Sequence, residues 1–124
     1  MTKFKSQGFN KTFKNARKGF NLAVRSEVNI RIHVAVAISV IILAFYLKFT
    51  PVEFCILLFV IALVICCEML NTAIEFTLDS IYHNRYSRMV GMAKDISAGA
   101  VMFATLISIF TGLILFGSKI IAIV

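Results

Sequence analysis

Hydrophobic residues fill three long runs of this sequence, and charged residues are confined mostly to the segments between them. The stretches without a charged residue are 32–47, 54–67 and 96–118, which contain 16, 14 and 23 residues. A helix that spans a membrane needs about 20 apolar residues, within a range of roughly 17–25. The third run meets that requirement by itself. The first two extend into flanks whose polar side chains can reach water or face inward.

Helix start signals turn these runs into three expected transmembrane helices. Pro51 follows a short turn and suits the first position of a helix, and no helix breaker follows it before Asp79. We therefore expect an all-α integral membrane protein that forms one domain over residues 1–124. Its transmembrane helices are expected at about 28–48, 51–80 and 92–118.

Small residues recur every four positions in the third of these helices, at Ala100, Ala104, Ser108 and Gly112. Such a stripe lets helices approach one another closely in lipid. Because three helices offer little interior, we also expect partner chains.

An amphipathic pattern precedes the first run, over about residues 4–25. At about 100° per residue, apolar and small residues share one side and basic or polar residues the other: Phe9, Phe13, Ala16, Phe20 and Ala23 against Lys11, Lys14, Lys18, Asn21 and Arg25. The pattern is typical of a helix that lies in the interface of an anionic leaflet. The alternative is a helix that packs on the protein's own core and leaves its basic face in water.

The composition agrees with a membrane protein. Hydrophobic residues make up 60% of the chain and charged residues 15%, against roughly 45–50% and 25% in soluble domains. The three cysteines lie in apolar runs without a Cys-x-x-Cys pattern, so we expect neither a disulfide nor a zinc framework. No groove-reading module accompanies the basic segment, and nucleic acid is not an expected partner.

The distribution of Lys and Arg predicts the orientation of the helices. Eight of the 13 basic residues precede residue 32, three lie in 85–94, and only Lys48 and Lys119 lie on the other side. The excess of positive charge on cytoplasmic segments places the N-terminus in the cytoplasm and the C-terminus outside. The first apolar run begins too late for a signal peptide. An organellar presequence is an alternative, because residues 1–26 are basic and contain no acid.

A stripe of polar side chains follows one face of the second expected helix. With Glu68 at zero, Asn71 falls at about −60°, Glu75 at about −20° and Asp79 at about +20° on a helical wheel. A charge at membrane depth costs several kcal/mol and calls for a paired, metal-bound or aqueous setting. The alternative, that the helix simply emerges from the membrane here, accounts well for Asp79 and poorly for Glu68.

Other ionisable residues are expected on the same side of the membrane. Glu27 lies where the first transmembrane helix begins, and Lys94 and Asp95 lie where the third begins. Glutamates from two helices suit a hard cation such as Mg²⁺, and a lysine beside them suits a phosphate. Glu27 has a second interpretation, a local ion pair with Arg31, and His33 has that of a polar helix contact. These residues favour nucleotide phosphate chemistry at a membrane surface.

Three motifs make the chain resemble a known family, the small prokaryotic membrane kinases that comprise diacylglycerol kinase and undecaprenol kinase. The family signature runs Glu-x-x-Asn-[Ser/Thr]-Ala-[Ile/Val]-Glu, three residues, Asp. The chain matches it with Glu68-Met69-Leu70-Asn71-Thr72-Ala73-Ile74-Glu75 and then Asp79. The two further matches are Ala93-Lys94-Asp95-Ile96-Ser97-Ala98-Gly99-Ala100-Val101 and Ser26-Glu27-Val28-Asn29-Ile30-Arg31-Ile32-His33.

The resemblance implies a homotrimer with three spans and a surface helix per chain, in the bacterial cytoplasmic membrane. Its members transfer the γ-phosphate of MgATP to a lipid hydroxyl at a cytoplasmic active site. By position, Glu68 matches the general base, and Asn71 supports the site. Glu27 and Glu75 match the ligands for Mg²⁺, which bridges the phosphates of ATP. The nucleotide-binding positions are matched by Glu27, Glu75, Lys94 and Asp95.

Undecaprenol is the expected acceptor, and diacylglycerol is the alternative. His33 and the run 98–101 resemble the undecaprenol kinase branch more than the enterobacterial diacylglycerol kinases, and the chain contains no Trp. A different class of function is a small channel or transporter subunit with glutamates lining a pore. Residues 54–67 carry no charged side chain, so the polar stripe does not cross the helix. A structural anchor would leave Glu68 and Asn71 unexplained.

Overall fold

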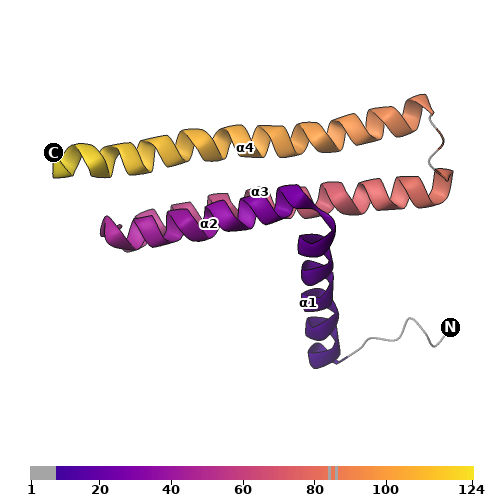
Figure 1. The fold of residues 1–124 in the computed structure, drawn as a ribbon, viewed down its shortest axis with the longest axis horizontal. Helices are drawn as coiled ribbons and strands as arrows, with labels where there is room; N and C mark the ends of the chain where they lie inside the picture. Colours follow the sequence, from indigo (N-terminus) through magenta and orange to yellow (C-terminus); the bar gives the residue numbers. More distant parts are fainter. Residues whose placement is uncertain (1–7, 84, 86) are drawn as a thin grey trace.

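Four helices account for nearly all of the described chain (Figure 1). The computed structural model describes residues 8–83, 85 and 87–124, and in these it contains α1 (Phe9–Ser26), α2 (Val28–Tyr46), α3 (Pro51–Tyr82), α4 (Arg88–Ile123) and no strand. Helices α2, α3 and α4 run side by side, and α1 projects steeply from them. The expected all-α class is confirmed, with three helices long and apolar enough to cross a membrane.

The bounds of the long helices follow from their caps. Helices α2 and α3 end within two residues of the expected 28–48 and 51–80. Helix α4 begins four residues before the expected 92 and ends five after the expected 118. It begins early because the Ser87 hydroxyl accepts a hydrogen bond from the backbone N–H of Val90 at 3.1 Å. The organisation of residues 1–124 as one domain stays a prediction.

Helix α3 starts where Pro51 predicted. Thr50 and Glu53 form a capping box, in which the Thr50 hydroxyl accepts from the Glu53 N–H at 3.3 Å and Glu53 Oε1 accepts from the Thr50 N–H at 2.8 Å. Pro51 supplies the preset φ of the first turn. The chain therefore reverses direction within residues 47–50.

A left-handed residue ends α2 in the same turn. Lys48 has φ 59°, its N–H donates to the Phe45 carbonyl at 3.2 Å, and the Phe49 N–H donates to the Ala44 carbonyl at 3.1 Å. These bonds form a Schellman motif, which satisfies the last carbonyls of the helix. It turns Phe49 inward, where it is buried in a cluster with Ala44, Leu57 and Leu115. We call this end of the bundle the turn end and the opposite end the α1 end.

An ion pair ties α4 to the turn end. Lys119 Nζ lies 2.9 Å from Glu53 Oε1 and donates to the carbonyl of Lys48 at 3.3 Å. The Lys119 side chain near the C-terminus of α4 therefore binds two groups of the turn between α2 and α3.

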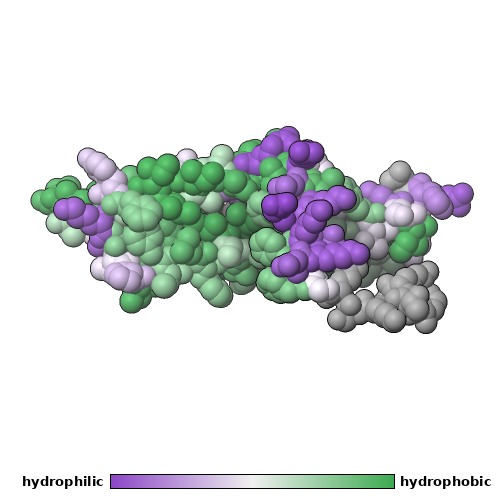
Figure 2. Space-filling model, turned by 90° about the horizontal axis from the view of Figure 1, so that it is seen from below, coloured by the Kyte–Doolittle hydropathy of each residue, from purple (hydrophilic) through white to green (hydrophobic). Residues whose placement is uncertain are grey.

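The long helices leave most of their large apolar side chains exposed. Phe59, Phe103 and Ile114 are between 67% and 73% exposed. Figure 2 shows an apolar surface along the bundle, with hydrophilic residues gathered over α1 and near the ends. Such a surface suits lipid or further protein rather than water.

Helix α1 does not bury its apolar stripe in the bundle. Phe9, Phe13 and Phe20 are 81%, 59% and 39% exposed, and Ala23 is its one residue classed as buried. Its expected first residues, 4–7, lie outside the described residues. Because α1 stands at a steep angle to the long helices (Figure 1), it lies close to the membrane plane when they cross the membrane. This arrangement favours the interfacial helix over one packed on the protein's own core.

Candidate active site

The polar stripe of α3 is buried in the bundle at Glu68 and half-buried toward the α1 end. Glu68 is only 6% exposed, Thr72 is 5% exposed, and Asn71, Glu75 and Asp79 are half-buried. The alternative that the stripe simply marks the exit of the helix from the membrane does not fit Glu68. A buried carboxylate needs partners from neighbouring helices, and the bundle supplies them.

His33 of α2 is the partner of Glu68. Its Nε2 lies 3.3 Å from Oε1 of Glu68, and the side chains are 25% and 8% exposed. His33 stands five residues into α2, about 8 Å along the axis from the bend with α1. The Glu68 carboxylate therefore lies just inside the level that α1 marks. The interpretation of His33 as a polar helix contact is confirmed, and the group that it contacts is the most buried acid, Glu68.

Asn71 links α3 to α4. Its Nδ2 donates to Oε1 of Glu75 at 3.1 Å, and its Oδ1 accepts from the hydroxyl of the buried Ser97. These two bonds fix which way the amide points and hold one oxygen of Glu75. Ser97 belongs to the motif 93–101, but the sequence alone did not predict a role for it. The one indication in the sequence was its position three residues after Lys94, which places the Ser97 hydroxyl on the same face of the helix.

Lys94 is already paired with an acid. Its Nζ lies 2.7 Å from Oδ1 of Asp79, and both side chains are a little over one-third exposed. Ion pairs with this exposure contribute only about 0–1 kcal/mol to stability. The pair joins α3 to α4 at the α1 end, and Lys94 can exchange its carboxylate for a phosphate at small cost.

Glu27 and Asp95 stand apart from this network. Among the described residues, neither side chain has a hydrogen bond or ion pair. Glu27 is half-buried at the bend between α1 and α2, whereas Asp95 is exposed. The alternative local pair of Glu27 with Arg31 is absent from the described part of the chain. Arg31 Nη1 donates instead to the carbonyls of Val24 and Arg25, at 3.0 and 2.9 Å.

The acidic side chains do not form a complete metal site by themselves. In the described ranges, no three His, Cys, Asp or Glu side chains are close enough to hold a metal ion together. Mg²⁺ is commonly bound through one or two carboxylates together with substrate phosphates. Glu75, held through one oxygen by Asn71, and the unpaired Glu27 are hard oxygen donors of the kind Mg²⁺ uses. The chemistry of each carboxylate therefore fits a metal that arrives with phosphates.

The arrangement separates two kinds of environment along α3. Glu68 is buried at the apolar side, and Glu75 lies seven residues on, about 10 Å further along the axis. Lys94 and Asp79 lie beyond Glu75 at the α1 end. A base can therefore act beside lipid while charged groups bind an ionic substrate on the water side.

One protein family and several proteins of known name are similar to this chain. The family model described as prokaryotic diacylglycerol kinase matches residues 14–116. An undecaprenol kinase of Bacillus subtilis is 36% identical over 111 residues, which cover 90% of this chain and 89% of that protein. A diacylglycerol kinase of Synechocystis is 32% identical over 101 residues, covering 82% and 58%. A diacylglycerol kinase of Escherichia coli K12 is 30% identical over 114 residues, covering 90% and 93%.

Proposed function

This chain belongs to the prokaryotic diacylglycerol kinase family and is a membrane lipid kinase, and from that premise we propose that it transfers the γ-phosphate of MgATP to undecaprenol. The product would be undecaprenyl phosphate. The observation that carries this proposal is the buried Glu68 carboxylate, which faces His33 beside an apolar bundle while Glu75 and Lys94 lie toward water. Neither a pore nor a structural anchor would require a buried carboxylate beside a separate set of charged groups.

Glu68 acts as the general base in this proposal. Its carboxylate takes the proton of the lipid hydroxyl as the hydroxyl oxygen bonds to the γ-phosphorus. The bond from that phosphorus to the bridging oxygen breaks, and ADP leaves with the electron pair. Phosphoryl transfer depends mainly on positioning and charge neutralisation. The buried position of Glu68 keeps water away from the reacting hydroxyl.

Glu75 and Glu27 would hold the divalent metal that the phosphoryl transfer needs, which we propose is Mg²⁺. The bound cation would neutralise charge on the phosphates. Asn71 orients the Glu75 carboxylate through its 3.1 Å bond. Lys94 and Asp95 contact the nucleotide, with Lys94 released from Asp79. We further propose that the functional unit is a homotrimer, which would cover apolar side chains that the single chain exposes.

The proposed location is the bacterial cytoplasmic membrane, with the α1 end and the N-terminus in the cytoplasm. The basic face of α1 would then meet the anionic leaflet, and MgATP would reach the site from the compartment that contains it. At the turn end, the ammonium of Lys119 pairs with Glu53 and donates to the backbone carbonyl of Lys48, which suits an outer surface with few free cations.

Competition between two lipids tests the proposed function. Purified protein is given radiolabelled ATP, Mg²⁺ and equal amounts of undecaprenol and diacylglycerol in an activity-supporting detergent. We expect most of the label in undecaprenol. Label mainly in diacylglycerol would support the alternative substrate, for which the relatives named diacylglycerol kinase are the reason. Label in neither lipid, from protein that remains folded, would contradict lipid phosphorylation.

Replacing His33 tests whether it positions the base. His33→Leu removes the group that positions the buried Glu68 carboxylate, so we expect kcat to fall about tenfold or more. The KM for ATP should stay within about twofold, because the nucleotide groups lie elsewhere. His33→Gln retains a donor and should recover most of the rate. Equal rates for the two variants would show that the contact does not serve catalysis.

A further inference from the structure

The bend between α1 and α2 is made by one residue. Helix α1 ends at Ser26, α2 begins at Val28, and Glu27 between them has extended values, φ −125° and ψ 120°. Sharp breaks in helices are usually caused by Pro or Gly, but residues 20–47 contain neither. The backbone could therefore continue as a helix here, and contacts made by side chains must hold the bend.

Arg31 makes hydrogen bonds that cross the bend. The last carbonyls of a helix have no partner within it. The next-to-last carbonyls of α1, those of Val24 and Arg25, accept from Nη1 of Arg31 at 3.0 and 2.9 Å. Because Arg31 belongs to α2, its guanidinium joins the end of one helix to the first turn of the next. A cation is also favourable at the negative C-terminal end of a helix.

Buried apolar side chains flank the same bend. Ile30 is fully buried and Ala23 is buried, one on each side of Glu27 in the sequence. Apolar burial is non-directional, so it keeps the two helices together without setting one angle between them. Hydrogen bonds have a preferred geometry. The bonds of Arg31 therefore add the direction that apolar contact lacks.

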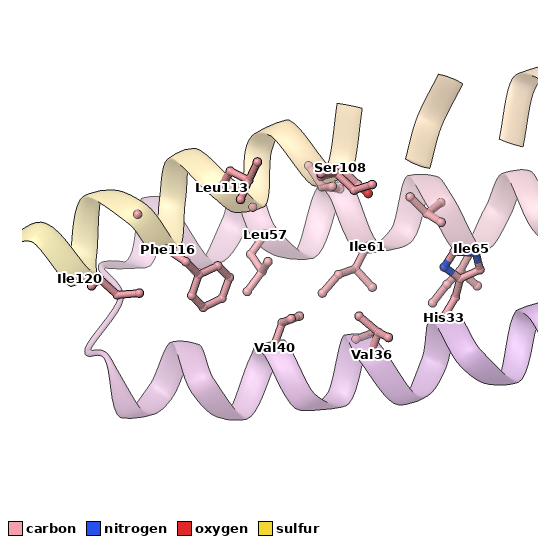
Figure 3. A pocket seen from close by; sticks show the side chains of 16 residues that line it. His33, Val36, Val40, Leu57, Ile61, Ile65, Ser108, Leu113, Phe116 and Ile120 are labelled. Carbon is pink, nitrogen blue, oxygen red and sulfur yellow. The ribbon is translucent and has the colours of Figure 1, made fainter. Parts of the chain in front are cut away.

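The start of α2 is fixed on the rest of the bundle. Two residues beyond Arg31, His33 points from α2 toward α3 (Figure 3), and its Nε2 lies 3.3 Å from Oε1 of Glu68. Arg31 extends this attachment across the bend to the end of α1. Glu27 lies between the two attached points, so its place relative to α3 depends on both.

The bonds of Arg31 also affect what Glu27 can bind. In an uninterrupted helix, residues 27 and 31 would lie one turn apart, and their opposite charges would pair. At the bend, Nη1 of Arg31 is held by carbonyls, and the Glu27 carboxylate has no partner in the part of the chain that the structure describes. The carboxylate is therefore available to a cation.

We propose that Arg31 is a positioning residue for the divalent metal. It locks the bend between α1 and α2, and so it keeps the Glu27 carboxylate free and in one place relative to α3. The proposal rests on the proposed function, in which Glu27 and Glu75 hold the metal that arrives with ATP. Arg31 acts through Glu27 and contacts neither the metal nor the nucleotide.

Arg31→Met tests this role, because methionine has no donor for the carbonyls at the end of α1. Calorimetry measures the binding of the Mg²⁺ complex of a non-hydrolysable ATP analogue. We expect its dissociation constant to rise about tenfold, the lower end of the loss for residues that orient a metal ligand. Binding of the metal-free analogue should not change. In the activity assay, the Mg²⁺ midpoint should rise with the dissociation constant, while kcat at saturating Mg²⁺ and ATP stays within about twofold of wild type.

Two further substitutions of Arg31 complete the test. Arg31→Lys keeps a cation with three donors, so it should recover most of the affinity for the metal complex. Arg31→Gln is neutral and too short to reach both carbonyls, and it replaces Arg31→Met in every measurement if that variant does not fold.

Arg25→Met is the matched control for charge. Arg25 is exposed and lies in the last turn of α1. Its substitution removes the same charge near the bend, while the backbone carbonyls still accept from Arg31. We expect wild-type binding of the metal complex. Equal losses in Arg25→Met and Arg31→Met would attribute the effect to charge near the site and would overturn the proposal.

Pulsed EPR measures the bend without any turnover. Spin labels at Asn21→Cys in α1 and Ser39→Cys in α2, both exposed positions, are placed in a chain without its three native cysteines. The labelled chains are diluted with unlabelled protein in vesicles, so that only distances within one chain are measured. Arg31→Met should broaden the distribution of distances, and Arg31→Lys should leave it narrow. An unchanged distribution in Arg31→Met would show that Arg31 does not hold the bend.

These measurements separate the role of Arg31 from the proposed function, because neither binding nor distance requires phosphoryl transfer. If Arg31→Met broadens the distances and weakens only the metal complex but no lipid is phosphorylated, the role of Arg31 stands and the proposed function fails. If a lipid is phosphorylated and Arg31→Met binds the complex as wild type does, the reverse holds. Equal weakening of the metal-bound and metal-free analogue would indicate direct contact of Arg31 with the nucleotide and would also overturn the proposal.

Discussion

Replacing Glu68 with glutamine is expected to lower phosphoryl transfer to the lipid by about 10²–10⁴-fold, the contribution of a positioned general base. Glutamine has the shape of glutamate, so it fills the same site beside His33. It cannot take the proton of the lipid hydroxyl. Initial rates at saturating lipid and MgATP measure the loss in kcat.

Two further measurements show whether that loss is chemical. Binding of MgATP, measured by calorimetry or with a fluorescent nucleotide, should change little, because Glu68 lies about 10 Å along α3 from Glu75. Thermal stability in detergent should change little, since glutamine keeps the shape of the side chain and an oxygen that can still accept from His33. A variant with normal nucleotide binding, normal stability and a rate within about tenfold of wild type would remove Glu68 from the role of base.

Glu53 offers a matched control on the same helix. It lies in the first turn of α3 at the turn end, where it joins the capping box and pairs with Lys119. Glu53→Gln should weaken that end of the bundle slightly and leave the transfer rate near the wild-type value. A large loss of rate in this variant would show that the effect of Glu68→Gln reflects the loss of any carboxylate from α3.

The fold was predictable because a membrane-spanning helix is recognisable from its own stretch of sequence. Charge-free runs gave the three spans, and Pro51 marked the start of α3 to the residue. The sequence did not predict the Ser87 cap, because Arg88 directly after it was assigned to the loop, and α4 therefore begins earlier than expected. Caps depend on short-range bonds that sequence encodes only weakly.

Contacts between helices were not predictable, because they depend on how each helix is rotated about its axis. The wheel placed Glu68 and Asn71 on one face of α3, and that face is buried or half-buried. It could not show that the face meets His33 of α2 and Ser97 of α4. The pairing of Lys94 with Asp79 also joins two helices. Lys94 is therefore not a free cation, and a phosphate would have to replace its carboxylate partner.

The backbone at Glu27 explains why the alternative interpretation, a local ion pair with Arg31, is wrong. The pairing with Arg31 assumed that residues four apart lie on one helix. Glu27 instead has φ −125° and ψ 120°, extended values, because it ends α1 and precedes α2. Arg31 is thereby left to cap carbonyls at the end of α1. The break frees the Glu27 carboxylate, as a metal ligand requires.

The stripe of small residues on α4 was only partly a packing surface. Ala104 is 3% exposed, in agreement with close helix contact. Gly112 instead lines an apolar cavity between α2, α3 and α4 (Figure 3), where an added Cβ atom would meet no heavy atom within 4 Å. Small residues on one face of α4 therefore allow close helix contact at Ala104 and leave an open cavity at Gly112. The spacing of small residues alone does not distinguish the two.

Replacing Glu75 with glutamine is expected to raise the Mg²⁺ concentration needed for half-maximal activity by about 10–100-fold or more, because an amide is a much poorer ligand for a hard cation than a carboxylate. The glutamine oxygen can still accept the hydrogen bond from Asn71, so the local geometry should persist. The KM for ATP should rise with the Mg²⁺ requirement, while kcat at saturating Mg²⁺ and ATP recovers in part. That recovery distinguishes Glu75 from Glu68, whose loss no metal concentration should restore.

Asp79 is the control for charge on the same stripe. It lies four residues beyond Glu75 and pairs with Lys94 at 2.7 Å in the structure, and we do not propose it as a metal ligand. Asp79→Asn removes one negative charge from the same helix face and should leave the Mg²⁺ midpoint near the wild-type value. If both variants move the midpoint equally, the shift reflects lost charge at the site rather than coordination. If Glu75→Gln alone leaves the midpoint unchanged, Glu75 does not hold the metal, and the ligands must be sought at Glu27 and on a neighbouring chain.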